Sequence, residues 1–329
     1  MATSPRWLLD VHSDESQFLT RMIEDVRRGL TANPRWLPPK YFYDEAGGRL
    51  FERITELPEY YLTRAEESIL QDIAGPLVER VRPRDFVELG PGSCRKARLL
   101  LNALPSPVNA RYVAVDVGRE GLTVAATALA EEYPSIHVHA VVGDFERHLS
   151  FLPPPWGRRL VVFLGSTIGN FDPPARRTLL IELRRLLGAD GRLLLGLDLV
   201  KDRWTLEAAY DDAAGVTAEF NRNVLCHLNH LVGGDFDPER FRHRAFYDAE
   251  ASRIEMHLVA DAPQRVRLER LDLTLDFAEG DDIWTENSYK FTREGTDAML
   301  AEAGLELEEW YTDAERRFAL ALCRPAARG

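Results

Sequence analysis

The segment from residue 85 to residue 199 alternates short apolar runs with amphipathic stretches, and this rhythm limits the possible folds more than any other feature of the chain. Short strands that are apolar along their whole length and separated by helices are typical of a parallel sheet that is covered on both faces. The sequence therefore predicts a doubly wound α/β sheet. Its five expected strands lie at 85–89, 111–116, 137–142, 159–164 and 192–199.

The alternation breaks after the fifth strand. Residues 200–285 hold a helical section at 206–231 and three hairpin-like stretches, and the α/β pattern then returns with a helix at 292–303. Two closing strands are expected at 305–311 and 317–323. The chain therefore predicts an α/β domain with an insertion at the carboxyl edge of its sheet, the edge where ligands bind in open α/β folds.

Glycine and acidic residues stand at the ends of the first three predicted strands. Gly90 and Gly92 follow the first strand, where glycine lets the backbone turn tightly and approach a ligand closely. Asp116 ends the second strand, where a carboxylate can accept both hydroxyls of a ribose. Asp144 follows the third and can accept from an adenine amine, while the backbone N–H of Phe145 donates to the ring. This pattern predicts a nucleoside cofactor.

Two cofactor classes compete for this site. A dinucleotide site favours a third glycine or alanine, but this chain has Arg95 at that position. The acid-x-Gly-x-Gly sequence at 88–92 resembles the methyltransferase pattern, and S-adenosylmethionine has no pyrophosphate. We therefore expect S-adenosylmethionine and keep an NAD(P) dehydrogenase as an alternative. The expected cofactor-binding residues are Glu88, Gly90, Gly92, Lys96, Asp116, Asp144 and Phe145.

Four longer motifs carry a more specific resemblance, which extends over residues 15–325. They are Pro39-Lys-Tyr-Phe-Tyr-Asp-Glu45, Leu57-Pro-Glu-Tyr-Tyr-Leu-Thr-Arg-Ala-Glu66, Phe163-Leu-Gly-Ser-Thr-Ile-Gly-Asn-Phe171 and Trp284-Thr-Glu-Asn-Ser-Tyr-Lys-Phe291. The chain resembles the histidine Nα-methyltransferases of ergothioneine biosynthesis, which convert histidine to its trimethylated betaine, hercynine. The resemblance implies a class I, Rossmann-like methyltransferase fold, in which the last strand is antiparallel to the rest.

The resemblance also implies a second, α+β domain that binds the substrate and is formed by the N-terminal segment and the insertion. The expected division gives 1–60 and 200–286 to substrate binding, and 61–199 and 287–329 to the methyltransferase domain. Histidine is expected between the two.

The same resemblance assigns roles to residues that would otherwise be read as core or surface positions. Asn170 and Tyr210 would bind the substrate carboxylate, since an amide and a phenol can both donate. Tyr60 would lie near the amine and the sulfonium and is the expected catalytic residue. The imidazole would be read by Tyr43, Glu286 and Ser288, with Met256 packing the side-chain pocket. In a strand, Glu286 and Ser288 would point to the same face.

Composition narrows the partners and the compartment. The net charge of −12 disfavours a nucleic-acid partner, because phosphate backbones repel an acidic surface. Three widely spaced cysteines, with no C-x-x-C pair, indicate a reducing compartment and no zinc site. No apolar run is long enough to span a bilayer, and the first residues lack signal-peptide features. We expect a cytoplasmic, metal-free enzyme, favour a monomer, and keep two alternatives to histidine methylation: methylation of a different small amine, and adenosylmethionine binding without catalysis.

Overall fold

The computed structural model describes residues 7–12, 15–105 and 109–327. The chain divides into two compact units, each built from separate stretches of sequence. Unit 1 comprises Met1–Ser13, Leu62–Val200 and Phe291–Gly329, and unit 2 comprises Asp14–Tyr61 and Lys201–Lys290. Part of the N-terminal stretch on which the expectation of no signal peptide rests, residues 1–6, 13 and 14, lies outside the described residues.

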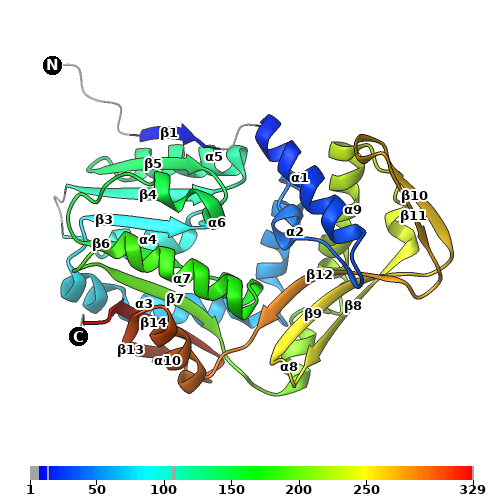
Figure 1. The fold of residues 1–329 in the computed structure, drawn as a ribbon. Coiled ribbons are helices and arrows are strands. Elements are labelled where there is room, and N and C mark those ends of the chain that lie inside the picture. The colour runs from blue at the N-terminus through cyan, green and yellow to red at the C-terminus, as the bar shows by residue number, and fades with distance from the viewer. Residues whose placement is uncertain (1–6, 13–14, 106–108, 328–329) are drawn as a thin grey trace. The chain divides into compact units, whose positions relative to one another are not determined.

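Unit 1 is built around one eight-stranded sheet in the order β1-β5-β4-β3-β6-β7-β14-β13 (Figure 1). The first six strands in this order, β1, β5, β4, β3, β6 and β7, run parallel to one another. Strand β14 is antiparallel to both of its neighbours, β7 and β13. The sheet is formed by β1 (Trp7–Val11), β3 (Asp85–Leu89), β4 (Ala110–Asp116), β5 (Ile136–Val142), β6 (Arg159–Phe163), β7 (Arg192–Asp198), β13 (Leu305–Thr312) and β14 (Phe318–Pro325). The predicted α/β sheet and its antiparallel last strand are confirmed.

Helices cover the sheet of unit 1, and its central strands β3 and β6 are therefore buried along their whole length. Its helices are α3 (Tyr61–Val81), α4 (Arg95–Asn102), α5 (Arg119–Glu132), α6 (Phe145–His148), α7 (Pro173–Leu187) and α10 (Arg293–Glu302), with short 3₁₀ helices η2 (Leu149–Phe151) and η3 (Thr167–Asn170). The order of the strands reverses between β3 and β6. The carboxyl ends of these two strands form the switch point at which an open α/β sheet binds its ligand.

Unit 2 holds a four-stranded sheet in the order β2-β12-β9-β8 and a separate hairpin, β10-β11. Its strands are β2 (Arg35–Trp36), β8 (Phe241–Asp248), β9 (Arg253–Ala260), β10 (Gln264–Leu268), β11 (Leu273–Phe277) and β12 (Asp282–Tyr289). Its helices are α1 (Glu15–Leu30), α2 (Glu45–Glu56), α8 (Arg203–Ala208) and α9 (Val216–Val232), with 3₁₀ helices η1 (Pro39–Phe42), η4 (Pro238–Arg240) and η5 (Glu269–Leu271). The unit is thus α+β, with a mainly antiparallel sheet.

The structure differs from the expected division at the N-terminus. Residues 7–11, expected in the substrate-binding part, form β1 and pair with β5 in the sheet of unit 1. Its residues are mostly apolar, yet their side chains are half-buried or exposed, unlike those of the central strands. At the other end of unit 2, residues 287–290 stay with that unit because β12 continues to Tyr289.

The expected helical section at 206–231 forms two helices. The chain leaves α8 at Ala208 and begins α9 at Val216, after Gly215, whose φ of +74° is the left-handed conformation that favours glycine. The carboxylate of Asp212 accepts from the N–H groups of Val216 and Thr217, at 3.0 and 2.7 Å. These bonds satisfy the first N–H groups of α9, so a new helix begins there and α8 does not continue into it.

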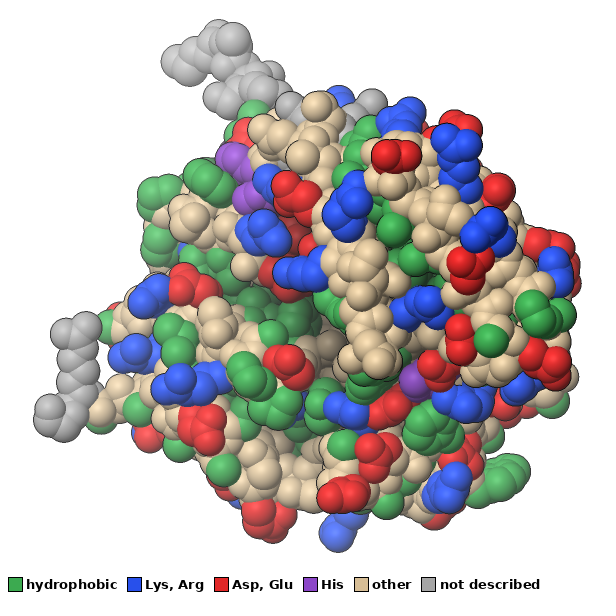
Figure 2. Space-filling view, turned by 45° about the vertical axis from the view of Figure 1, so that its right-hand side comes forward, with side chains coloured by type: hydrophobic (Ala, Val, Ile, Leu, Met, Phe, Trp, Pro, Cys, Tyr) green, Lys and Arg blue, Asp and Glu red, His purple; other side chains and the backbone are tan. Residues whose placement is uncertain are grey.

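Two searches of the described part of the chain bear on membranes and metals. None of its helices is long and apolar enough to cross a membrane. Within the same residues, no group of three or more His, Cys, Asp or Glu side chains is placed to hold a metal ion. On the face drawn in Figure 2, Lys and Arg side chains are intermixed with Asp and Glu.

Candidate active site

The predicted cofactor residues meet at the carboxyl edge of the sheet in unit 1. Strands β3, β4 and β5 are neighbours in register, so the segments that follow them lie side by side. The N–H of Gly90 donates to the carbonyl of Val115 at 2.9 Å, and the N–H of Gly143 donates to the carbonyl of Asp116 at 2.9 Å. These two bonds extend the ladder by one step into the loops and fix the loops relative to each other.

The glycines of the first loop adopt conformations that require glycine. Gly90 and Gly92 have φ values of +63° and +52°, and a Cβ added at either position would meet no atom within 4 Å. The backbone therefore turns sharply and leaves open space beside it. This is the arrangement expected of a loop that accepts a ligand against its main chain.

Asp116 ends β4 with its carboxylate held from one side. Oδ1 accepts from the N–H of Gly118 at 2.9 Å. Burial raises the pKa of this carboxyl above its usual value, while hydrogen bonds from the backbone N–H groups of Gly118, Val117 and Gly92 oppose the rise. Asp116 is therefore tied to the glycine loop and can still accept hydrogen bonds from a ligand with its other lone pairs.

Asp144 and Phe145 begin α6, directly after β5. The Asp144 side chain accepts from the N–H of Glu146 at 3.0 Å and so caps the helix, while its own N–H donates to Nδ1 of His148 at 2.9 Å. The Phe145 ring packs edge-on against Phe163, with centroids 5.5 Å apart. Both predicted residues thus lie at the carboxyl edge of the sheet, and Asp144 also caps α6.

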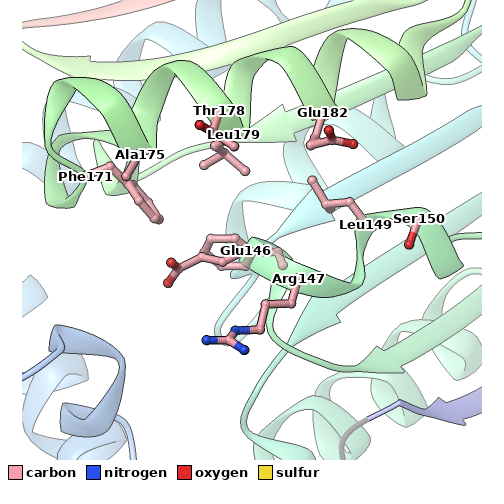
Figure 3. A pocket seen from close by; sticks show the side chains of 10 residues that line it. Glu146, Arg147, Leu149, Ser150, Phe171, Ala175, Thr178, Leu179 and Glu182 are labelled. Atoms are coloured by element: carbon pink, nitrogen blue, oxygen red, sulfur yellow. The ribbon is translucent and has the colours of Figure 1, made fainter. Parts of the chain in front are cut away.

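A pocket of about 370 Å³ opens beside Phe145 (Figure 3). It lies within unit 1. One wall is formed by α6 and η2, and the other by Phe171 and residues 175–182 of α7. Phe145 and Phe171 line it together, with ring centroids 6.3 Å apart. Phe145, one of the predicted cofactor residues, is therefore part of a partly aromatic pocket wall.

Glu88 is more deeply buried than a ligand-facing carboxylate would be. It is 3 % exposed and accepts from the hydroxyl of Tyr112 in β4 at 2.5 Å. Burial raises its pKa to about 7, against the opposing effects of the Tyr112 hydrogen bond and the Lys96 charge. Sequence reasoning missed Tyr112, because a tyrosine within an apolar strand reads as a core residue.

In unit 2, five of the predicted substrate residues share one region. The hydroxyls of Tyr210 and Ser288 lie 2.7 Å apart, and the rings of Tyr210 and Tyr60 are 6.4 Å apart between centroids. In the sheet, Glu286 of β12 is paired directly with Met256 of β9. Directly opposite residues of antiparallel strands point to the same face, so Met256 packs beside Glu286.

Glu286 carries an electrostatic signature of its own. Burial raises its pKa to about 7, and the positive charge of Lys290 opposes that rise. Lys290 is itself buried and donates to Ser288 Oγ at 2.8 Å and to the Tyr210 hydroxyl at 3.0 Å. Sequence reasoning did not single out Lys290, although Glu286, Ser288 and Lys290 follow one another at intervals of two residues.

The two remaining substrate residues lie in different surroundings. Tyr43 follows η1 and is 41 % exposed, with its ring edge-on to Phe51 at 5.7 Å between centroids. The ring of Phe51 in turn lies 6.1 Å from the ring of Tyr60, measured between centroids. The Phe51 ring therefore contacts the rings of both Tyr43 and Tyr60. Asn170 belongs to unit 1, where it is the last residue of η3 and half-buried.

Comparisons with known proteins identify the family. Residues 22–325 match the model of the family described as histidine-specific, SAM-dependent methyltransferases. The histidine N-alpha-methyltransferases of Mycolicibacterium smegmatis and Mycobacterium tuberculosis are 49 % and 48 % identical to the chain, and each alignment covers 91 % of this chain and 93 % of the relative. Ergothioneine biosynthesis protein 1 of Neurospora crassa is 33 % identical over 84 % of this chain, which spans 32 % of that longer protein.

A solved S-adenosylmethionine-dependent methyltransferase from Clostridium acetobutylicum superposes with a TM-score of 0.47 at 12 % identity, over 84 % of this chain and 98 % of that one. The family match and the nearly full-length relatives agree with the resemblance seen in the four motifs and leave no support for the dehydrogenase alternative. The chain belongs to the histidine-specific, S-adenosylmethionine-dependent methyltransferase family.

Proposed function

We propose that this chain transfers methyl groups from S-adenosylmethionine to the α-amino nitrogen of free histidine, in three successive steps that give hercynine and open ergothioneine biosynthesis. The family match and the names of its relatives support the reaction. The structural observation that supports the substrate assignment is the polar cluster of unit 2, in which the hydroxyl of Tyr210 lies 2.7 Å from that of Ser288, a residue on the same strand as Glu286.

The imidazole would be read by Glu286 and Ser288. A carboxylate accepts from one ring N–H, and a hydroxyl can serve the other ring nitrogen as donor or acceptor. A site that pairs both ring nitrogens rejects analogues that lack them, because its own polar groups would be left unsatisfied. Met256, opposite Glu286, would pack the apolar part of the side chain, and Tyr43 would contribute to the same recognition by the family resemblance.

The backbone end of histidine would be held by donors. Tyr210 and Asn170 can each donate to a carboxylate, and we assign both to that role. Tyr60 would orient the lone pair of the amine through its hydroxyl. The amine must lose a proton before each transfer, and release to solvent through the Tyr60 hydroxyl provides a route.

The residues at the edge of the sheet in unit 1 fit S-adenosylmethionine. Open space beside Gly90 and Gly92 leaves room for the ligand against the backbone, and Asp116 offers acceptors to the ribose hydroxyls. Asp144 and the N–H of Phe145 would read the adenine, while Lys96 would pair with the only anionic group of the cofactor, its carboxylate. When bound, S-adenosylmethionine supplies a methyl group that its sulfonium already activates.

The chain's own contribution to the rate would be placement. A neutral amine held in line with the methyl group, in a site that excludes water, gains the advantage of an intramolecular reaction. Because the substrate residues carry hydroxyl, amide and carboxyl groups rather than a strong base, positioning rather than proton abstraction would dominate. Glu88, whose carboxylate is buried against the hydroxyl of Tyr112, would support the loop of Gly90 and Gly92 from the interior of the sheet.

The proposal is tested with methyl-labelled S-adenosylmethionine and histidine in a single-turnover assay that resolves the mono-, di- and trimethylated products. Transfer to the α-amino nitrogen supports the proposal. Cofactor binding without transfer to any amine would favour a binding module. If Tyr60→Phe leaves all three rates unchanged, the role assigned to Tyr60 is wrong.

Three further parts of the account stay predictions. Cytoplasmic location rests on the reducing compartment that the cysteines indicate, and Cys94, Cys226 and Cys323 are free thiols in the structure. The monomeric state and the lack of a metal requirement come from the sequence alone. Gel filtration with light scattering and an assay in the presence of a chelator test the last two.

A further inference from the structure

Glu66 is a buried acidic residue at the end of one of the four family-like motifs, and no role has been given to it so far. It lies in the first half of α3 and has no solvent-exposed surface. Its two carboxylate oxygens accept from the backbone N–H of Gly165, at 2.9 and 3.0 Å. One of them, Oε2, also forms an ion pair with the ammonium of Lys96. A single side chain thus joins α3, α4 and the loop after β6.

The backbone around Glu66 is shaped to admit it. A Cβ added to Gly196 in β7 would lie 2.1 Å from Glu66 Oε1 and 3.2 Å from the nitrogen of Gly165, so no other residue fits there without displacing the carboxylate. Gly165 itself has a φ of +72°, and a Cβ at that position would lie 3.8 Å from Lys96 Nζ. Gly196 therefore keeps the space that the carboxylate occupies, whereas the positive φ of Gly165 favours glycine for the backbone itself.

The pair depends on both partners. A buried carboxylate is costly unless charge-assisted hydrogen bonds satisfy it, and removal of one partner leaves the other charge uncompensated. The Lys96 side chain is 21 % exposed, so part of it stays accessible while its ammonium pairs with the buried carboxylate. An ammonium has three N–H donors, so Lys96 can hold Glu66 and still donate to a ligand.

We propose that Glu66 is a positioning residue, which fixes the Lys96 ammonium toward the carboxylate of the cofactor and fixes Gly165, five residues before Asn170. It acts through other residues and does not touch the reacting atoms. The inference rests on the cofactor role proposed for Lys96. It adds a link between the start of α4, which follows the loop after β3, and the loop after β6, on the two sides of the switch point of the sheet.

The test compares two ligands that differ only in the amino-acid portion. S-adenosylhomocysteine carries the carboxylate, whereas 5′-methylthioadenosine keeps the adenosine and the sulfur and lacks it. In calorimetry, Glu66→Gln is expected to weaken binding of S-adenosylhomocysteine roughly 10- to 100-fold, the range for loss of a hydrogen-bonded charge. Binding of methylthioadenosine should change less than about threefold, because its contacts lie elsewhere. A purely structural role would weaken both ligands alike.

Glu67→Gln is the matched control, because Glu67 is the next residue on the same helix and pairs with Arg95, the neighbour of Lys96. It should leave the ratio of the two dissociation constants unchanged. Lys96→Met should reproduce the loss seen in Glu66→Gln, and the double variant should bind no more weakly than either single variant, since the two residues act as a unit. Additive losses would overturn the proposal, and so would tighter binding by Glu66→Gln.

Thermal unfolding shows whether each variant is folded. If Glu66→Gln fails to fold, Gly196→Ala provides the second test, because the added methyl group displaces the Glu66 carboxylate from its place without removing its charge. The same ligand-selective loss is expected, and equal weakening of both ligands would refute the proposal. The outcome is separable from that of the proposed function, because a wild-type protein that fails to methylate histidine still gives the ratio of the two ligand affinities.

Discussion

Tyr210 and Ser288 place their hydroxyl groups 2.7 Å apart although 78 residues separate them in the chain. Lys290 donates to both, at 3.0 and 2.8 Å, so the two hydroxyls and the ammonium form a closed triangle. Every member of the triangle is buried. Polar networks of this kind are specific only while all their members are satisfied, and the proposed recognition of histidine depends on this one.

Tyr210→Phe is therefore expected to raise the KM for histidine roughly tenfold or more, because it removes a hydroxyl that would otherwise pair with Ser288, with Lys290 and with the substrate. The affinity for S-adenosylhomocysteine, measured by calorimetry, should stay the same. Tyr289→Phe is the matched control, since Tyr289 pairs with Arg253 and is not among the proposed substrate residues. Equal effects of both variants on KM would remove Tyr210 from the substrate site.

Glu286→Gln changes the acceptor proposed for the ring N–H of histidine. We expect a histidine KM that is higher by roughly one to two orders of magnitude, the range for loss of a charged hydrogen-bond partner. Methylation of other amino acids should rise relative to histidine, because the site would no longer be built around an imidazole N–H. Competition assays with pairs of amino acids measure this ratio. Unchanged selectivity would show that the imidazole is read elsewhere.

The same residue predicts a pH dependence of stability. Burial raises the pKa of Glu286 to about 7, above its value in the unfolded chain, so the folded state favours the protonated form. The unfolded chain gives up this proton at lower pH, so Glu286 destabilises the fold progressively as the pH rises from about 4.5 through about 7. The difference in free energy of unfolding between Glu286→Gln and the wild type should grow in favour of the variant over that range. A flat difference in denaturant titrations at several pH values would contradict the raised pKa.

Asp116→Asn tests the cofactor edge in the absence of substrate. The amide can still accept from the N–H of Gly118, so the loop should keep its shape while the ribose loses a charged acceptor. We expect the affinities for S-adenosylhomocysteine and for methylthioadenosine to fall together, roughly tenfold, because both ligands carry the ribose. Asp190→Asn, at an exposed position in the same unit, is the control. A loss confined to S-adenosylhomocysteine would place Asp116 near the amino-acid portion instead.

Most of unit 1 could be predicted from the sequence, because its strands are apolar throughout and its loops carry glycine. The strand predicted at 85–89 matches β3 residue for residue. The edge strand β1 could not be predicted in the same way. It lies before the α/β alternation that begins at residue 85, and its place is determined by backbone pairing with β5, which has no sequence signature.

The residues of the candidate site differ in how far the sequence alone could predict them. Gly90, Gly92 and Asp116 follow from the chemistry of strand ends, whereas the substrate residues came from the family resemblance alone. Contacts made by distant segments were not visible in the sequence. Glu66 reads as one more charge in a helical motif, and only the fold shows that it is wholly buried against Lys96 and Gly165. Lys290 likewise reads as a strand-end charge until Tyr210 is brought beside it.

The most direct test of the central claim is an incubation of the purified protein with S-adenosylmethionine and an equimolar panel of the common amino acids, with the products read by mass spectrometry. The account predicts trimethylated histidine as the dominant product, with its methyl groups on the α-amino nitrogen. Methylation of a different amino acid in preference to histidine would contradict it, while leaving the fold and the cofactor site intact.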